Sequence, residues 1–221
     1  MSMIYLDNNA TTIMPAVVKT AMIEWCNRGN PSAGYASAKE ARAMMNDLRL
    51  QLGRLCGFDA CCPEKRDGGS VASLLPRYNV IFTSGASEAN ATVLHGVVAA
   101  HRERRGHVPH IVMSAIEHKS LLDMAKSYES RGIAAVTFVK PTPSGHIRPE
   151  DVAAAILPHT CLVCVMHANN ETGAINDVAG IATVAHQRGV AFHCDTVQTF
   201  GKGLCADIVP HVDSFCVSFH K

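Results

Sequence analysis

Short apolar runs and longer amphipathic stretches alternate along the chain from residue 78 onward. The apolar runs that predict strands lie at 78–83, 110–113, 133–139, 161–166, 190–194 and 215–218. The stretches that predict helices with one apolar face lie at 87–104, 119–130, 149–157 and 178–187. Buried strands that alternate with amphipathic helices are typical of a mostly parallel α/β sheet with helices on both faces. We therefore predict this fold class.

The first part of the chain follows a different pattern. Residues 15–26 predict a helix with Val18, Met22 and Trp25 on one face, and Pro15 suits its first turn. Residues 37–56 predict a second, longer helix, and Gly29–Ser32 between the two has the composition of a turn. Residues 57–77 contain two prolines, three glycines and mixed charge, which indicates a surface insertion.

The composition is that of an ordinary globular protein with a core. Hydrophobic residues make up 48% of the chain and charged residues 18%, and the formal net charge is +1. This balance gives no reason to expect binding to nucleic acid or to a membrane. The densest basic run, at 101–107, is interpreted as the solvated end of a helix, where cations are favoured. No apolar run approaches a membrane span and no secretory signal is visible, so a cytoplasmic protein is expected, or an organellar one if a presequence is missing.

The cysteines do not predict a disulfide framework or a metal site. Nine cysteines are scattered along the chain, and an odd number argues against paired bridges. Cys161 and Cys164 have the spacing of a metal motif, but they lie in a predicted strand with no second pair nearby. We therefore expect no bound metal.

Polar residues follow the predicted strands, and ligands in parallel sheets bind beyond the carboxyl ends of the strands. Residues 84–88 follow the first strand and open a helix, where small residues leave backbone N–H groups free for an anion. The alternative is a plain helix cap provided by Ser84. His118 follows the second strand, and its imidazole can stack on a flat ligand, carry protons or be purely structural.

The remaining strands are followed by further chemically capable residues. Asn169 and Asn170 come after the strand at 161–166, either as hydrogen-bond donors to a ligand or as part of a turn. Asp195 ends a buried strand, where a carboxylate is costly unless it is paired with a cation. The residues after the last strand are Ser218, His220 and Lys221. Together, these groups suit pyridoxal phosphate, which has a phosphate, a flat ring, a phenolic oxygen, a pyridinium nitrogen and an aldehyde that condenses with lysine.

Seven motifs in the chain resemble those of the NifS/IscS-like cysteine desulfurases, in the class V group of fold-type I pyridoxal-phosphate enzymes. They are "YLDNNATT" (5–12), "GNPS" (29–32), "TSGASEAN" (83–90), "EHKS" (117–120), "HANNETG" (167–173), "HCDTVQTFGK" (193–202) and "SFHK" (218–221). The resemblance covers nearly all of the chain except 57–77. It implies the large domain of a fold-type I transferase, incomplete, over residues 15–221, and an N-terminal segment, 1–14, that contributes to a small domain. The chain resembles the N-terminal part of such an enzyme, up to the lysine that binds the cofactor.

The resemblance also implies a role for individual residues. Lys221 would hold the cofactor covalently, and Asp195 would pair with its pyridinium nitrogen. His118 would stack on the ring and shuttle protons, which makes it, with Lys221, a catalytic candidate. The other implied contacts are Gln198 and Asn170 to the phenolic oxygen, Ala86, Ser87, Ser218 and His220 to the phosphate, and Asn8 and Ala10 near the substrate entrance.

The implied activity is removal of sulfur from L-cysteine, giving alanine and an enzyme persulfide for iron–sulfur cluster or thio-cofactor synthesis. A homodimer and a sulfur-acceptor or scaffold protein are the implied partners. The nucleophilic cysteine of the family lies in a loop that matches nothing in this chain. A selenocysteine lyase shares these motifs, whereas "ANNETG" disfavours the further alternative of a class V aminotransferase. A truncated homologue acting as a binding subunit is the non-enzymatic alternative.

Overall fold

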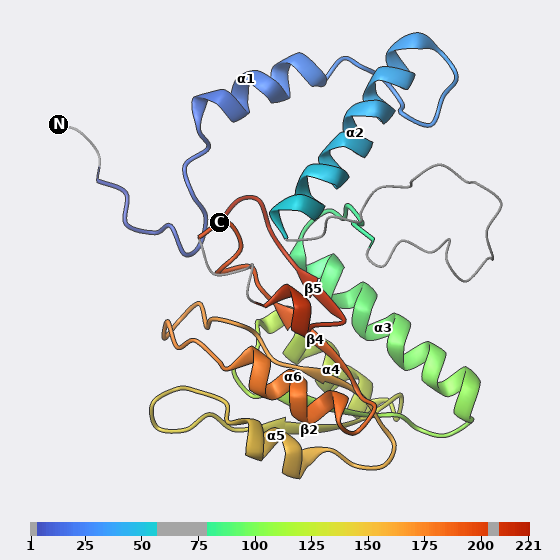
Figure 1. Ribbon diagram of the computed structural model, residues 1–221, viewed down its shortest axis with the longest axis vertical. Coiled ribbons are helices and arrows are strands. Elements are labelled where there is room, and N and C mark those ends of the chain that lie inside the picture. The colour runs from blue at the N-terminus through green and yellow to red at the C-terminus, as the bar shows by residue number, and fades with distance from the viewer. Residues whose placement is uncertain (1–3, 57–78, 203–207) are drawn as a thin grey trace. The chain divides into compact units, whose positions relative to one another are not determined.

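The computed structural model describes residues 4–56, 79–202 and 208–221 (Figure 1). The chain divides into two compact units, one of residues 1–82 with His220 and one of residues 83–219 with Lys221. The insertion predicted at 57–77 lies outside the described residues. Within the described ranges, no helix has the length and apolar character needed to cross a membrane.

The second unit is built on a sheet of five parallel strands in the order β2-β1-β3-β4-β5. The strands are β1 (His110–Ser114), β2 (Ala135–Val139), β3 (Thr160–Cys164), β4 (Ala191–Asp195) and β5 (Ser214–Cys216). This arrangement confirms the predicted fold class. The strands at 161–166 and 215–218 end two residues earlier than predicted.

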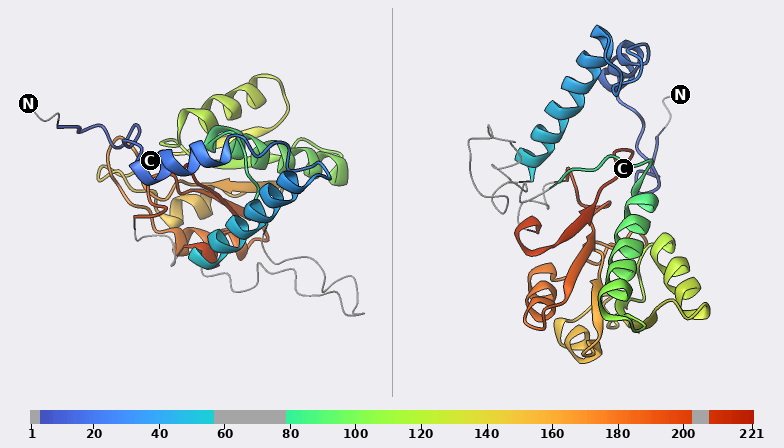
Figure 2. Two further views of the ribbon diagram at one scale, coloured as in Figure 1. Left: turned by 90° about the horizontal axis from the view of Figure 1, so that it is seen from above. Right: turned by 90° about the vertical axis from the view of Figure 1, so that its right-hand side faces the viewer.

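Four α-helices cover the two faces of this sheet. They are α3 (Ala86–Arg105), α4 (Lys119–Ser130), α5 (Pro149–Ala155) and α6 (Val178–His186), and a 3-10 turn follows at Val209–His211. Helices α3 and α4 pack on one face, and α5 and α6 pack on the other (Figure 2). Their ends carry the expected signals, since Pro149 opens α5 and Gly106, at a φ of 70°, closes α3 in the left-handed conformation.

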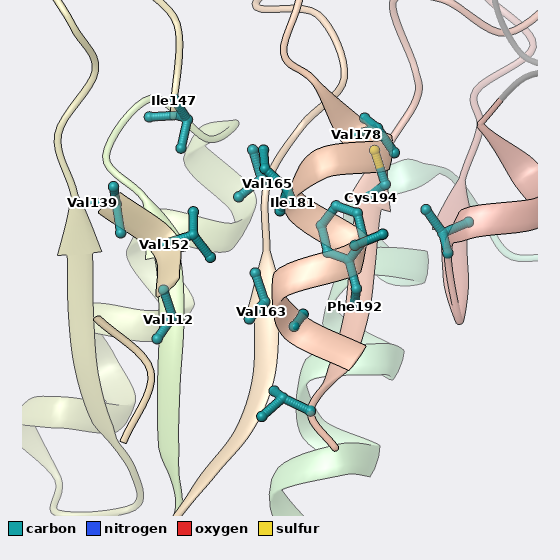
Figure 3. Packing of buried hydrophobic residues seen from close by; sticks show 14 of the residues in the cluster. Val112, Val139, Ile147, Val152, Val163, Val165, Val178, Ile181, Phe192 and Cys194 are labelled. Carbon is teal, nitrogen blue, oxygen red and sulfur yellow. The ribbon is translucent and has the colours of Figure 1, made fainter. Parts of the chain in front are cut away.

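The core consists of two clusters of buried side chains, one on each face of the sheet. Val112, Val163 and Phe192 point toward α5 and α6, where they meet Val152 and Ile181 (Figure 3). On the other face, the buried side chains of the strands pack against α3 and α4. Burial on both faces explains why the strands read as continuous apolar runs rather than as alternating ones.

The strand order reverses between β1 and β3, and this reversal fixes the place where a ligand fits. The chain moves outward from β1 to β2 and then crosses back to β3, β4 and β5. At such a switch point the connections after the two central strands diverge to opposite faces, which opens a crevice at their carboxyl ends. The segments that follow β1 and β3 contain His118 and Asn170, respectively.

The prediction of a strand at 78–83 is wrong for residues 79–83, the part of this range that the structure describes. Residues 79–83 form no strand, and Ile81 is 71% exposed. A strand needs a neighbour to accept its ladder of hydrogen bonds, and no strand of the described residues pairs with this segment.

The first unit contains α1 (Ala16–Trp25) and α2 (Ala36–Leu55), close to the two predicted helices. The turn between them depends on Gly29, which has a φ of 80°. A Cβ at this position would lie 2.6 Å from the hydroxyl oxygen of Tyr35. That hydroxyl accepts a hydrogen bond from Asn30 N at 2.9 Å, so glycine and tyrosine together shape the turn.

Candidate active site

Most predicted site residues of the second unit lie at the carboxyl edge of the sheet. His118 caps the N-terminus of α4 after β1, Asn170 follows β3, and Asp195 is the last residue of β4. Ser218 and Lys221 follow β5. Because all five strands are parallel, these segments leave the sheet at the same edge.

Asp195 is held by neutral donors. Its side chain is 4% exposed, and its Oδ2 accepts a hydrogen bond from Asn90 Nδ2 at 3.0 Å. Its Oδ1 accepts from Val197 N at 3.0 Å. None of the ion pairs among the described residues includes Asp195. A buried carboxylate without a cation is costly, so this group is prepared for a positively charged partner.

Asn90 is the hub of the network, and the sequence analysis did not identify it. Its Oδ1 accepts hydrogen bonds from His193 Nε2 at 2.8 Å and from Cys216 Sγ at 3.0 Å, while its Nδ2 donates to Asp195. The signal was present, because Asn90, Leu94 and Val98 are the buried residues of α3 and lie four positions apart. A polar residue on the buried face of a helix needs a partner inside the protein.

His193 is a neutral member of the same network. Burial lowers its pKa to about 4, although Asp195 partly opposes the shift. Since the oxygen of Asn90 can only accept, the ring proton lies on Nε2, and Nδ1 accepts from the hydroxyl of Ser214 at 2.9 Å. The carboxylate of Asp195 is therefore not neutralised by an imidazolium at neutral pH.

Glu117, beside the predicted His118, is a buried acid. Burial raises the pKa of Glu117 to about 8, despite hydrogen bonds from the Ser114 hydroxyl and the Met166 backbone N–H to its Oε1. The negative charge of Asp195 raises the pKa further. Its Oε2 is buried and has no hydrogen-bond partner among the described residues. Glu117 therefore keeps its proton at neutral pH.

His118 is exposed, and its hydrogen bonds fix its tautomer. Its Nδ1 accepts from Ser120 N at 3.2 Å and lies 2.8 Å from Ser120 Oγ. An Nδ1 that accepts from a backbone N–H carries no proton, so the neutral ring is protonated on Nε2. This atom is the one that can exchange a proton with a ligand.

The start of α3 favours the anion interpretation over the plain cap. The N-cap is Gly85, which makes no side-chain cap hydrogen bond, so Ser84 is not the cap. The carboxylate of Glu88 instead accepts from Ser84 N at 2.6 Å. The N–H groups of Ala86 and Ser87 thus have no side-chain cap at the positive end of the helix dipole.

The loop after β3 is organised by Asn169, while the predicted Asn170 is half-buried beside it. Asn169 Oδ1 accepts from the backbone N–H groups of Glu171 and Thr172, each at 2.9 Å. Its Nδ2 donates to the Ile116 carbonyl at 2.8 Å, which joins the segments after β1 and β3 across the switch point. Asn170 Nδ2 donates to Glu171 Oε1 at 2.6 Å.

The other predicted residues have the following positions. Gln198, Ser218 and Lys221 are half-buried in the second unit. Asn8, Ala10 and His220 belong to the first unit and are exposed. In that unit, the His220 carbonyl accepts a hydrogen bond from Thr12 N at 2.6 Å. The hydrogen bonds from Asn90 to Asp195 and from His193 and Cys216 to Asn90, and the buried acid Glu117, were not predicted.

Three cysteines of the sheet strands keep their protons. Burial raises the pKa of Cys161 to about 11 and raises those of Cys164 and Cys216 further. A thiol that keeps its proton is a poor nucleophile. No group of three or more potential metal-ligating residues is assembled in the described part of the chain.

The residues at this edge fit pyridoxal phosphate by the chemistry of their donor set. Asp195 supplies a buried anion without a cationic partner, which suits a pyridinium N–H. The uncapped start of α3 supplies N–H donors for a phosphate, and Lys221 supplies an amine for an aldehyde.

Comparisons with known proteins agree with this assignment. A model of the family "Aminotransferase class-V" matches residues 70–221. The cysteine desulfurase IscS of Anaeromyxobacter sp. (strain K) is 35% identical over 99% of the chain and 50% of the relative. Among solved structures, SspA in complex with cysteine has a TM-score of 0.80 at 29% identity, covering 96% of this chain and 56% of that chain. A NifS-like protein has a TM-score of 0.80 at 28% identity, covering 96% and 54%.

The chain spans about half the length of the curated relatives it matches. Its five-stranded sheet corresponds to part of the large domain of fold-type I pyridoxal-phosphate enzymes. The family match covers most of the chain, from before α3 to Lys221. We conclude that the chain belongs to the class-V aminotransferase family, whose members use pyridoxal phosphate.

Proposed function

We propose that the protein containing this chain is a pyridoxal-phosphate-dependent cysteine desulfurase. In the net reaction, L-cysteine and an enzyme thiol give L-alanine and an enzyme persulfide. The observation that carries the proposal is the buried Asp195 carboxylate, oriented by Asn90 and without a cation among the described ion pairs. The similarity to cysteine desulfurases and to a structure described as a complex with cysteine supports this substrate.

The chain's residues would each perform a limited task. Pyridoxal phosphate, when bound, supplies an aldehyde and an electron-withdrawing ring. Lys221 would bind the aldehyde, and Asp195 would keep the ring nitrogen protonated. Asn90 would hold the Asp195 carboxylate in place through its 3.0 Å hydrogen bond. The N–H groups at the start of α3 would bind the phosphate.

His118 would move the proton. Its exposed ring carries the proton on Nε2 when neutral, as its contacts to Ser120 indicate. When Nε2 gives up its proton, the ring would keep one on Nδ1, where Ser120 Oγ at 2.8 Å can accept it, and Nε2 could then take a proton back. Asn170 and Gln198 would donate hydrogen bonds to the phenolic oxygen, as the resemblance implies.

The thiol that receives sulfur is proposed to lie outside the described residues. The buried thiols of Cys164 and Cys216 keep their protons, because burial raises their pKa values. We also propose a homodimer, and transfer of the persulfide sulfur to an acceptor or scaffold protein. The exposed apolar side chains of α1, including Val17, Met22 and Ile23, support association with another surface.

The test is to locate the lysine that binds the cofactor and to relate it to activity. The full-length protein, loaded with pyridoxal phosphate, is reduced with borohydride, digested and analysed by mass spectrometry. The label is expected on Lys221. In parallel, sulfide and alanine are assayed with L-cysteine and with L-selenocysteine, and Lys221→Ala should abolish product formation from both.

Lys202→Ala is the matched control, since Lys202 is exposed in the same unit. This variant should keep the label on Lys221 and most of the activity. A label on Lys119, Lys140 or Lys202 would refute the assignment of Lys221. Turnover of L-selenocysteine alone would replace the desulfurase with a selenocysteine lyase.

A further inference from the structure

A basic pocket lies at the edge of the sheet opposite to Asp195. It has a volume of about 530 Å³ and lies at the amino ends of β3 and β4. Its lining includes Arg104, Arg105, Arg188, His101, His107 and His159 beside apolar side chains. These come from the last turns of α3 and from the segments that precede β1, β3 and β4. All of them belong to the second unit.

The ionisable side chains that line the pocket are mainly basic, and none is a carboxylate. Three arginines and three histidines line it, and no Asp or Glu does. None of the ion pairs among the described residues includes Arg104, Arg105 or Arg188. The chain as a whole has a formal net charge of only +1, so this concentration is local. Guanidinium groups gathered without carboxylates attract anions, and they suit phosphate through paired N–H donors.

The end of a helix explains only part of this arrangement. Arginines in the last turn of α3 complement the negative end of the helix dipole, as the sequence analysis assumed for the run at 101–107. Arg188, which follows the end of α6, and His159 come from other segments, and the dipole of α3 does not explain why they line the same pocket. Arg188 is anchored by a hydrogen bond from Nη1 to the Ala153 carbonyl at 2.7 Å, so its position is set independently of α3.

The histidines supply a second, independent sign of a ligand. The Nε2 atom of His101 is buried and has no hydrogen-bond partner among the described residues. Its ring centroid lies 5.0 Å from that of His107, which in turn lies 6.1 Å from that of His159. Burial lowers the pKa of His101, and the neighbouring His107 and Arg105 lower it further. A buried ring nitrogen without a partner needs a hydrogen bond, and a ligand bound beside the arginines can supply one.

The size of the pocket and its apolar lining residues indicate the class of anion that it can bind. Small-molecule sites in proteins have volumes of roughly 300–1,000 Å³, and a single phosphate needs far less. The pocket combines its cationic groups with the apolar side chains of Val97, Ala100 and Pro158. We propose that this pocket binds an organic phosphate of nucleotide size, with its phosphates at Arg104, Arg105 and Arg188 and its apolar part beside Val97 and Pro158.

The test uses the full-length protein, loaded with pyridoxal phosphate and freed of excess cofactor, so that its own phosphate site is filled. Isothermal titration calorimetry is performed with ADP, with inorganic pyrophosphate and with adenosine at one fixed salt concentration. ADP should bind more tightly than pyrophosphate, and adenosine should bind least. Arg104→Gln and Arg188→Gln should each weaken ADP binding by about tenfold, a change of 1.4 kcal/mol.

Arg102→Gln is the matched control, because Arg102 lies in the same last turn of α3 but does not line the pocket. This variant should change ADP affinity by less than about twofold if the lost contact is local. The visible absorbance of the bound cofactor checks that each variant is folded. Absence of ADP binding, an equal loss in Arg102→Gln, or tighter binding of a single-stranded oligonucleotide than of ADP would overturn the proposal.

Discussion

Helices α1 and α6 have a similar amino-acid composition, but α1 is exposed and α6 is largely buried. Each is short and rich in Ala, Val and Ile, with ten and nine residues respectively. In α6, Val178, Ile181, Ala182 and Ala185 are buried against the sheet, whereas no residue of α1 is buried. The comparison shows that an apolar helix does not make a core by itself, because burial needs a second apolar surface.

The same contrast separates the two units. The second unit contains both hydrophobic clusters, and it also buries polar side chains such as Asn90 and Asp195. In the first unit the contacts that orient the turn between the helices are mainly polar, such as the 2.8 Å ion pair of Arg28 and Glu40. Exposed apolar side chains on α1 are typical of a surface that another segment or subunit covers.

The largest effect is expected at Asp195, the buried carboxylate of the second unit that is proposed to contact the cofactor. Asp195→Asn should lower turnover of L-cysteine by about a hundred- to ten-thousand-fold, because losing one member of a buried charge pair costs about 3–5 kcal/mol. The fold should survive, since the side chain keeps its shape and loses only one of its two accepting oxygens. Steady-state alanine formation measures the loss, and circular dichroism checks the fold.

Asp123→Asn is the control for that change, because Asp123 lies on α4 with its side chain 58% exposed, 4.0 Å from Lys119. Its activity should be close to that of the wild type. Near-normal turnover in Asp195→Asn would mean that the buried carboxylate is structural, and the contrast between the units would then concern stability alone.

A matched pair of isoleucines tests the packing difference directly. Ile181 on α6 is fully buried and Ile23 on α1 is 73% exposed. Ile181→Ala should lower the free energy of unfolding by about 2–5 kcal/mol, through lost transfer energy and a cavity. Ile23→Ala should change it by no more than about 0.5 kcal/mol. Urea unfolding at several protein concentrations measures both.

The concentration series adds a second readout to this pair. If α1 is covered by another subunit, the cost of Ile23→Ala should grow as the assembled form becomes populated. A large, concentration-independent loss for Ile23→Ala would instead show that α1 is buried within its own chain.

The smallest effect concerns how the stability of the second unit changes with pH. The pKa of Glu117 rises from 4.5 to about 8 on folding, so the folded state binds its proton more tightly than the unfolded state does. Its contribution to stability is therefore complete below pH 4.5 and is lost as the pH rises toward 8. Between pH 6.5 and 8 the loss should be about 1–2 kcal/mol, and Glu117→Gln should remove it.

Urea unfolding at pH 6.5 and pH 8 measures this slope, and Glu129→Gln, an exposed change on α4, serves as the control. His193 contributes in the other direction and in a separate range. Its pKa falls to about 4 on folding, so its contribution is present above pH 6.5 and is lost as the pH falls toward 4. An unchanged slope in Glu117→Gln would show that Glu117 is ionised in the folded protein.

The sequence by itself determined the element order and the edge that carries the candidate site. Periodicity predicted the helices of both units, and short apolar runs predicted the five strands that pair. Since parallel strands place their carboxyl ends together, His118, Asn170 and Asp195 could be assigned to one edge before their positions were known. These inferences need only local spacing and one rule of topology.

Tertiary structure decided which surfaces meet. Asn90 reaches Asp195 across 105 positions in the sequence, and the basic pocket gathers α3 with the segments before β3 and β4. Residues 79–83 are apolar but form no strand, and α1 is apolar but exposed. Local periodicity shows which face of an element is apolar or polar. The neighbour that this face meets depends on strand order and long-range packing, which no local pattern contains.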